Sequence, residues 1–462
     1  MRRRSVITAA AVLGAALVWA GAGAGARAEG GNRTKVYDSG EVYEGQFREG
    51  RQHGRGVLER PDGFRYEGEF EDGWIAGEGI ARYPDGSVYS GEFQAGKPHG
   101  RGRIDFPGGD SYEGDWVDGR IEGEGVARYA DGSVYEGAFR DNAQNGRGVL
   151  TRPDGYRYEG GFRDRLPHGE GRAVYPDGSV YEGDWVEGRR EGEGRLELAD
   201  GFVYEGEWVD GRFHGAGVAV HPNGDRYEGG FTGGERTGEG VLTYADGSVY
   251  EGGFLAGRRH GEGVFEAPDG FRYEGGWVEG RIEGEGRMRY PDGTVHVGRF
   301  RAGEAHGPGR IEYAEGGWYE GDWVEGRIEG EGVLVTAEGA RYEGGFRDGR
   351  HHGEGRLEHP EGYVYEGDWR AGVQHGEGRS VFADGSVYEG GFREGLRHGQ
   401  GRLETPDGFV YAGEWSEGRI EGEGRAEYAT GDVYVGRFRD GRRDGPGDRK
   451  STRLNSSHVC SS

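Results

Sequence analysis

Residues 43–56 read YEGQFREGRQHGRG, and this stretch recurs along the chain at a fixed spacing of 23 residues. Eighteen copies follow one another without insertion or deletion between Glu41 and Gly447. A fixed period of this length is typical of an array of supersecondary units, each stacked on its neighbours. The leading residues of the copies are Tyr43, Tyr66, Tyr89, Tyr112, Tyr135, Tyr158, Tyr181, Tyr204, Tyr227, Tyr250, Tyr273, His296, Tyr319, Tyr342, Tyr365, Tyr388, Tyr411 and Tyr434.

Each repeat begins with a strand pattern. We number positions within a repeat from its leading tyrosine, which is position 0. Positions 0, 2 and 4 read aromatic, glycine, aromatic, as in Tyr112, Gly114 and Trp116, whereas positions 1 and 3 are mostly charged or glycine. Such alternation with a period of two predicts a strand with one aromatic face.

Two turn signals alternate along the array. Asp118-Gly119, at positions 6 and 7, is typical of a two-residue hairpin turn with positive φ at the glycine. Pro84-Asp85-Gly86 is typical of a three-residue loop. With two strands and two turns in an odd period of 23, a three-residue loop is needed to return each tyrosine to the same face. The sequence therefore predicts alternating two- and three-residue loops.

This register can be followed across the repeats. It places position 17 of one repeat opposite position −2 of the next, as in Arg60 and Phe64, and 15 of the 17 such junctions carry one aromatic ring. On the other face, position 10 should lie opposite position 5 of the next repeat. The ion pairs predicted there are Glu122/Arg140, Glu283/Arg301, Glu329/Arg347 and Glu421/Arg439, and a second class of pair is represented by His99/Val117.

Positions 11 and 13 are glycine in every repeat, and position 15 is apolar in nearly every repeat. The two-residue turn predicts that position 0 lies opposite Gly at position 13, and that position 2 lies between glycines at 11 and 13. Aromatic rings could then lie flat over backbone without side chains, which would offset the cost of glycine in a strand.

These features predict an all-β fold: tandem 23-residue β-hairpins, 18 in number, forming one elongated, twisted antiparallel sheet. One face is expected to be a trough of aromatic residues and glycine, and the other to be charged and mainly acidic. Only 33% of residues are hydrophobic and 103 of 462 are glycine, so the chain cannot build one thick core. The net charge of −26 favours solubility and disfavours nucleic acid or anionic lipid as a partner.

The regions outside the array differ in composition. Residues 1–28 have a basic start, an apolar stretch and an Ala26-Arg27-Ala28 motif, which predicts an export signal cleaved near Ala28. An uncleaved membrane anchor over residues 6–26 is the alternative. Residues 29–40 are a polar lead-in, residues 41–447 the array, and residues 448–462 a tail expected to be disordered or artefactual. Cys460, the one cysteine, lies in that tail, which excludes disulfides and multi-cysteine metal sites.

The array resembles the MORN repeat. The resemblance rests on Tyr-Glu-Gly-Asp-Trp with glycine at positions 7, 11 and 13, and on segments such as His99-Gly100-Arg101-Gly102, and it covers about nine-tenths of the chain. It implies tandem hairpins in an extended twisted sheet, and service as a scaffold, dimerisation module or membrane-associated tether. Phosphoinositide binding has been proposed for the family. This chain departs from the usual layout through its export signal and the lack of a second, catalytic domain.

The aromatic trough is the candidate binding site. Its rings could stack on sugars, lipid tails or a proline-rich peptide, or they could simply be the thin core of the fold. The candidate residues are Tyr112, Trp116, Tyr181, Trp185, Trp208, Trp277, Tyr319, Trp323, Trp369 and Trp415.

Other chemistry has little support in the sequence. The nine histidines at position 10 are His53, His99, His168, His214, His260, His306, His352, His375 and His398. Most are 46 residues apart, or about 19 Å in a sheet, which favours hydrogen-bonding histidines over shared metal ligands. Acids at the turns could bind Ca²⁺ weakly, but no loop has EF-hand spacing. No nucleophile elbow, phosphate-binding loop or zinc motif is present, so we expect neither an enzyme nor a cofactor.

The resulting functional hypothesis is a non-enzymatic scaffold or binding protein of the cell envelope or exterior. Its partner would be another protein or a second copy of the chain, joined through the trough or the open end strands. The alternative is an envelope binder of lipid or glycan that uses the aromatic trough. The expected location is periplasmic, secreted or at the cell surface.

Overall fold

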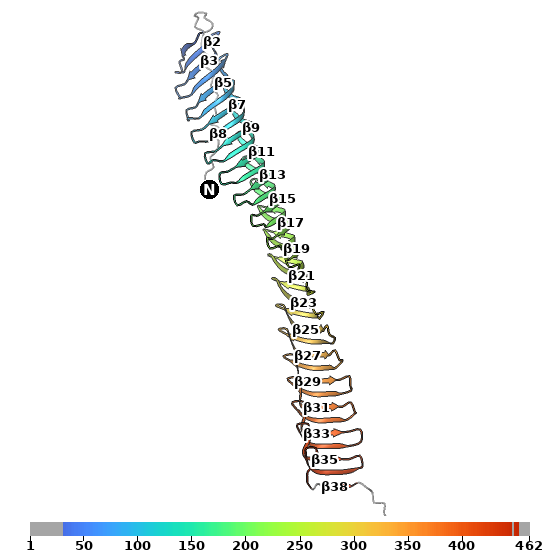
Figure 1. The fold of residues 1–462 in the computed structure, drawn as a ribbon. Coiled ribbons are helices and arrows are strands. Elements are labelled where there is room, and N and C mark those ends of the chain that lie inside the picture. The colour runs from blue at the N-terminus through green and yellow to red at the C-terminus, as the bar shows by residue number, and fades with distance from the viewer. Residues whose placement is uncertain (1–30, 446–447, 452–462) are drawn as a thin grey trace, which may run out of the picture. The chain divides into compact units, whose positions relative to one another are not determined.

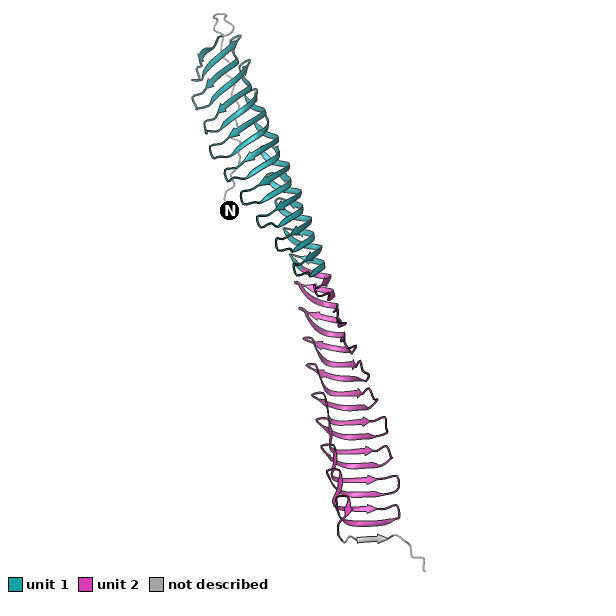
Figure 2. Cartoon of the chain, viewed as in Figure 1, with its two compact units in different colours: residues 1–235 teal, residues 236–462 magenta. Residues whose placement is uncertain are grey.

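The structure is a computed structural model, and it describes residues 31–445 and 448–451. Every regular element in these residues is a β-strand, as the sequence predicts. The described residues contain no helix that could cross a membrane. The chain divides into two compact units, Met1–Glu235 and Arg236–Ser462, which are considered separately below (Figure 2).

The strands that begin in unit 1 are β1 (Arg33–Val36), β2 (Val42–Arg48), β3 (Arg51–Glu59), β4 (Arg65–Glu71), β5 (Trp74–Arg82), β6 (Val88–Gln94), β7 (Lys97–Asp105), β8 (Ser111–Val117), β9 (Arg120–Arg128), β10 (Val134–Arg140), β11 (Ala143–Thr151), β12 (Arg157–Arg163), β13 (Leu166–Val174), β14 (Val180–Val186), β15 (Arg189–Glu197), β16 (Val203–Val209), β17 (Arg212–Val220), β18 (Arg226–Thr232) and β19 (Glu235–Thr243), whose remaining residues belong to unit 2.

The further strands of unit 2 are β20 (Val249–Leu255), β21 (Arg258–Glu266), β22 (Arg272–Val278), β23 (Arg281–Arg289), β24 (Val295–Arg301), β25 (Glu304–Glu312), β26 (Trp318–Val324), β27 (Arg327–Val335), β28 (Arg341–Arg347), β29 (Arg350–Glu358), β30 (Val364–Arg370), β31 (Val373–Val381), β32 (Val387–Arg393), β33 (Leu396–Glu404), β34 (Val410–Ser416), β35 (Arg419–Glu427), β36 (Asp432–Arg439), β37 (Arg442–Arg443) and β38 (Asp448–Ser451).

Within each unit, successive strands lie side by side and pair antiparallel (Figure 1). β4, for example, pairs with β3 before it and with β5 after it. Each repeat is thus one hairpin, and each hairpin adds its two strands to the same sheet. The predicted fold of tandem antiparallel hairpins is confirmed.

The two-residue turns have the left-handed geometry that a hairpin requires. Asp118 and Gly119 have φ angles of 50° and 81°. Positive φ at both central residues is characteristic of a type I′ turn, whose twist matches that of the flanking strands. The glycine N–H also donates to a carbonyl of the preceding repeat, as from Gly119 to Pro98 at 2.9 Å, and this bond joins the turns of neighbouring hairpins.

The three-residue loops confirm the predicted register between repeats. Arg60 N–H donates to the Phe64 carbonyl at 2.8 Å, and Gly63 N–H donates to the Arg60 carbonyl at 3.1 Å. The carboxylate of Asp62 accepts a hydrogen bond from Phe64 N–H at 2.9 Å, which holds the loop closed. Position 17 therefore faces position −2 of the next repeat, as expected.

The register within each hairpin differs from the prediction. Tyr43 lies opposite Leu58 rather than Gly56, and Gly45 lies opposite Gly56. A bulge at residues 53–55 of β3 causes the shift, and Gly54 within it has a φ of 64°. Because the bulge adds two residues, every later side chain keeps its face. The alternation of side chains in the sequence is therefore the same with or without the bulge, and it could not predict the bulge.

The central expectation, that rings cover glycine backbone, holds in the structure. A methyl group added to Gly125 would lie 2.6 Å from Cζ of Tyr112, because the ring rests on this glycine and on its cross-strand partner Gly114. The Tyr112 hydroxyl donates to the Asp115 carbonyl at 3.1 Å. The same bond to the carbonyl of position 3, at 2.9–3.2 Å, is made by all 17 leading tyrosines.

Aromatic residues at position 4 complete this thin core. The Tyr66 ring meets Phe70 of its own repeat and Phe93 of the next one edge to face, at centroid distances of 5.2 and 5.0 Å. Edge-to-face contacts of this kind add to the stability gained by burial of the rings. Tyr66 thus joins two consecutive hairpins, and it is fully buried although the sheet has a single layer.

Short strands also lie at the two ends of the array. β1 falls within the polar lead-in and pairs with β2, and β38 pairs with β36. Residues 448–451 are therefore a strand here, whereas the sequence analysis assigns them to a disordered or artefactual tail. The predicted export signal and Cys460 lie outside the described residues.

We predict that Gly125→Ala lowers the free energy of unfolding by about 1–3 kcal/mol, because the added methyl group displaces the Tyr112 ring. The matched control is Gly108→Ala in a loop of the same unit, where an added methyl group meets nothing within 4 Å. Thermal unfolding of both variants would check this. Equal melting temperatures for the two variants would contradict the ring-on-glycine packing.

Candidate functional site

The ten candidate trough residues all lie on the aromatic face, but within its buried layer. They are Tyr112, Trp116, Tyr181, Trp185, Trp208, Trp277, Tyr319, Trp323, Trp369 and Trp415, and none exposes more than 7% of its surface. Six of the tryptophans donate an indole N–H to the carbonyl of a glycine at position 13 in the preceding repeat, at 3.0–3.3 Å. The structure thus places these rings in the core and occupies their faces with protein groups.

Position 9 covers the tyrosines, and the sequence analysis missed it. Phe213 stacks on Tyr204 at 3.9 Å and 20°, and His351 stacks on Tyr342 at 3.6 Å and 11°. Elsewhere an arginine guanidinium lies over the rings, as Arg259 does over Trp277 at 4.0 Å. Position 9 is an even number of residues from the glycines at positions 11 and 13, so alternation alone places its side chain on the aromatic face. The residue at position 9 differs between repeats, being Ile, Gln, Pro, Arg, Phe or His, and for this reason the sequence analysis did not recognise it as part of the aromatic face.

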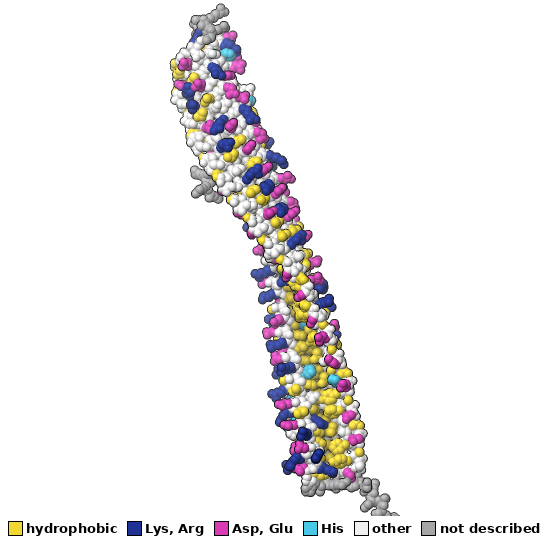
Figure 3. Space-filling view, in the orientation of Figure 1, with side chains coloured by type: hydrophobic (Ala, Val, Ile, Leu, Met, Phe, Trp, Pro, Cys, Tyr) yellow, Lys and Arg dark blue, Asp and Glu magenta, His cyan; other side chains and the backbone are white. Residues whose placement is uncertain are grey.

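A second row of rings lies beside the three-residue loops, at positions 17 and −2. Tyr156 and Tyr175 are neighbours in this row, with ring centroids 5.7 Å apart. Side chains at position 9 reach some of these rings, as when Gln144 donates to the Tyr129 hydroxyl at 2.8 Å. A band of hydrophobic side chains is seen along unit 2, with charged side chains on either side of it (Figure 3). This outer layer is the surface that a partner of the aromatic face would meet.

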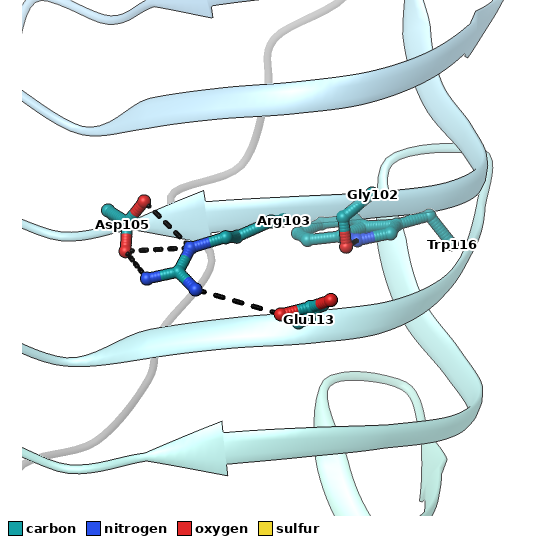
Figure 4. Close-up of polar contacts among 5 residues, drawn as sticks. All are labelled: Gly102, Arg103, Asp105, Glu113 and Trp116. Carbon is teal, nitrogen blue, oxygen red and sulfur yellow. Dashed lines mark hydrogen bonds and ion pairs between the residues drawn. The ribbon is translucent and has the colours of Figure 1, made fainter.

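The polar face carries a ladder of arginine and carboxylate side chains. Arg103, at position 14, donates to Asp105 of its own strand at 2.7 Å, and its other terminal nitrogen lies 3.6 Å from Glu113 of the next strand (Figure 4). Arg310 repeats the arrangement with Glu312 and Glu320 at 3.1 and 3.0 Å. Each such arginine has two acceptor sites, at position 16 of its own repeat and at position 1 of the next.

The four ion pairs predicted between positions 10 and 5 do not form; Glu122/Arg140, Glu283/Arg301, Glu329/Arg347 and Glu421/Arg439 are wrong. These glutamates instead accept a backbone N–H from position 6 of the next repeat, as Glu329 does from Asp348 at 2.9 Å. An N–H that points out of a tight turn is a fixed donor with no partner in its own hairpin. At three of these turns, an arginine at position 8 pairs with the carboxylate at position 6 of the next repeat, as Arg327 does with Asp348 at 3.0 Å.

Carboxylates at position 3 cap the bulge. Asp115 accepts a hydrogen bond from Glu124 N–H at 3.0 Å, and Asp368 accepts one from Glu377 N–H at the same distance. The bulge leaves this N–H, at position 12, without a partner on the adjacent strand. An acid at position 3 therefore has a structural role in these repeats.

The histidines at position 10 do not converge. Among residues 31–445 and 448–451, no group of three or more His, Cys, Asp or Glu side chains could hold a metal ion. His99 instead lies at a turn, where its Nδ1 is 3.5 Å from Asp118 N. The same place is taken by the capping glutamates in other repeats, which explains why histidine and glutamate alternate at this position.

His296, the one substitution at position 0, disturbs the core. Its Nε2 is buried without a hydrogen-bond partner, and so is the indole N–H of its neighbour Trp323. The two ring centroids are 4.7 Å apart. Burial lowers the pKa of His296 from 6.5 to about 4, because the charged form would be desolvated.

The repeat sequence, the hairpin register and the tyrosine-on-glycine packing identify the family. The MORN repeat matches the chain in 18 consecutive segments, from residues 43–65 to residues 434–451. The chain belongs to the MORN repeat family. No curated protein matches this MORN repeat chain.

Several solved structures show a weak likeness. The TCP10 domain of Danio rerio CPAP, in complex with a peptide of STIL, is 14% identical, and the match covers 62% of this chain and 96% of that one with a TM-score of 0.18. The Drosophila melanogaster SAS-4 TCP domain, in complex with a proline-rich motif of Ana2, is 12% identical over 45% and 96%, with a TM-score of 0.17. A Staphylococcus aureus virginiamycin B lyase is 12% identical over 65% and 90%, with a TM-score of 0.12. At TM-scores this low, no property of those proteins is carried over.

We predict that His296→Tyr stabilises unit 2 and reduces its sensitivity to acid. Because burial lowers the pKa of His296 in the folded state, the unfolded state binds the proton first as the pH falls below about 6.5. Stability is therefore lost between about pH 6.5 and pH 4. The loss attributable to His296 is about 2 kcal/mol at pH 5.

Urea unfolding of the parent and the variant at pH 8 and pH 5 would check this prediction. The parent should lose about 2 kcal/mol more than the variant on acidification. His351, whose pKa burial also lowers to about 4, is present in both proteins and cancels from the comparison. Equal acid sensitivity of the two proteins would show that His296 is not buried in its neutral form.

Proposed function

We propose that this MORN repeat protein is a non-enzymatic scaffold of the cell envelope or exterior, and that it binds another protein along its aromatic face. The observation that carries the proposal is the layered build of this face. A constant core at positions 0 and 4 supports an outer row at position 9 that differs from repeat to repeat. A constant support with a variable outer row suits recognition of one extended partner.

The family supports the non-enzymatic part of the proposal, because MORN repeats act in general as binding or scaffold repeats. Near-identical repeats also offer no irregular cluster of groups of the kind that catalysis needs. The export signal that the sequence predicts over residues 1–28 supports a location outside the cytoplasm. Protein is favoured over lipid or glycan as partner, because stacking on those ligands would use the ring faces of residues such as Trp116 and Trp369, which are buried.

Photo-crosslinking from the two faces of one repeat would test the proposal. A photoreactive phenylalanine analogue at Phe213, on the aromatic face, should crosslink to a protein partner in the producing cells. The same analogue at Glu205, which is exposed on the polar face of the same repeat, is the matched control and should give little product. The reverse yields would contradict docking on the aromatic face.

Cell fractionation of the same cultures tests the location independently. The crosslinked protein should be found in the envelope or the medium, with a mature N-terminus near Glu29. A full-length chain recovered from the cytoplasm would contradict export while leaving the crosslinking result valid.

A further inference from the structure

On the polar face, one arginine at position 14 has no carboxylate at either of its two acceptor sites. Nine repeats carry arginine at position 14, and each arginine has two acceptor sites, at position 16 and at position 1 of the next repeat. At Arg287 these two sites hold Arg289 and Val297. It is the only one of the nine arginines that lacks an acid at both sites, and it is the only one that forms no ion pair with a described residue.

The adjacent strand removes further negative charge. β24 (Val295–Arg301) carries Arg299 and Arg301 and no acid. Arg299 occupies position 3, where an acid caps the bulge in other repeats. The N–H that such an acid would accept is absent here, because position 12 of this repeat is Pro308. The fold therefore does not need a carboxylate at this place, and an arginine can stand there at no cost to the bulge.

The result is a local reversal of charge in a chain of net charge −26. Five arginines lie on the polar face of β23 and β24: Arg281 beside the two-residue turn, and Arg287, Arg289, Arg299 and Arg301 further along; none of the five forms an ion pair with a described residue. Four glutamates lie nearby. Glu274, opposite Arg287 on β22, is held by Arg272 at 2.6 Å, and Glu283 caps Ala302 N–H at 2.9 Å. Glu285 lies opposite Arg299 and Glu304 lies opposite Arg301, and neither forms an ion pair with a described residue.

The same strand departs from the repeat in its core as well. His296 replaces tyrosine there, at the cost of two unsatisfied ring nitrogens. Places where a regular sequence breaks its own local rules are often functional. Here the departures at positions 0, 1, 3 and 12 fall together in one repeat, with Val297 exposed over 46% of its surface between the arginines.

We propose that this patch, formed by Arg287, Arg289, Arg299 and Arg301 around Val297, binds an extended acidic peptide segment of a partner protein. Two arginines at i and i+2 of a strand are about 6.7 Å apart, which is also the spacing of carboxylates at alternate residues of an extended peptide. Such carboxylates would take the places of the two that are missing beside Arg287, and would form charge-assisted hydrogen bonds like the one between Arg103 and Asp105.

The surroundings favour a narrow peptide over a membrane. Glu274 on β22 and Glu312 on β25 are exposed on the strands that flank the patch, and a flat anionic bilayer would meet them together with the arginines. A single strand can lie along the arginines and avoid both glutamates. A groove of about 770 Å³ continues from Val297 past Pro308 and Trp318 to Arg341, but Glu320, Asp322, Glu331 and Glu343 also line it, so an acidic segment would be confined to the patch.

Binding of a fluorescent peptide with alternating residues, (Glu-Thr)₄, to the full chain tests this inference by fluorescence anisotropy. The decisive variant is Val297→Glu, which restores the residue found at position 1 in most repeats and should fold normally. Its carboxylate supplies Arg287 with an internal partner, so we expect at least tenfold weaker peptide binding. Ser90→Glu adds the same charge at the same position of a repeat in unit 1, and it should bind within twofold of the parent.

Arg299→Gln is a second variant that removes a cation without adding an acid, and it should weaken binding severalfold. Raising the salt concentration should weaken binding of the parent peptide complex. No binding by the parent, or equal binding by Val297→Glu, would overturn the inference. Binding of phosphatidylserine vesicles without binding of the peptide would also overturn it. Because the patch is on the polar face, none of these outcomes bears on docking at the aromatic face.

Discussion

A tyrosine ring lying on a pair of cross-strand glycines is the contact on which this structure depends. A single-layer sheet has no second layer to bury its apolar side chains, so it must bury them within its own thickness. Glycine at positions 2 and 13 makes room for the ring, and the hydroxyl then reaches the carbonyl of position 3, as Tyr112 does with Asp115. The ring thereby becomes fully buried and its polar end is satisfied, which meets both requirements for a buried tyrosine.

The same contact explains how the repeats join. Tyrosines such as Tyr66 and Tyr388 meet the position 4 ring of their own hairpin and of the next, so core contacts join consecutive hairpins within each unit. The polar face adds a separate set of links, with arginines at position 14 and glutamates at positions 1 and 10. These links are exposed and contribute little stability individually, but they have fixed geometry. The junction at which Arg287 and Val297 omit these links therefore changes its surface while it keeps its fold.

The sequence predicted the features that alternation and turn chemistry determine. The strands, the two loop lengths, the pairing of Arg60 with Phe64 and the position of rings over glycine followed from parity and from glycine placement. It could not predict the two-residue bulge at Gly54, because an even insertion leaves every face unchanged. The sequence also could not predict the partner of Glu329. The carboxylate accepts a backbone N–H of the turn instead of pairing with Arg347, and a backbone N–H is not visible in the pattern of side chains. For the candidate site, the sequence found the aromatic face but chose its buried rings and missed Phe213 and His351 in the layer above them.

The most direct test of the central contact is the chemical shift of the glycine Hα protons. In protein labelled selectively on glycine, Gly114 and Gly125 should show Hα resonances upfield of ordinary glycine, because the Tyr112 ring lies on both residues. Replacement of Tyr112 with leucine should return these two resonances towards their ordinary positions while those under other rings stay shifted. Glycine Hα resonances at ordinary positions in the folded parent protein would contradict the account.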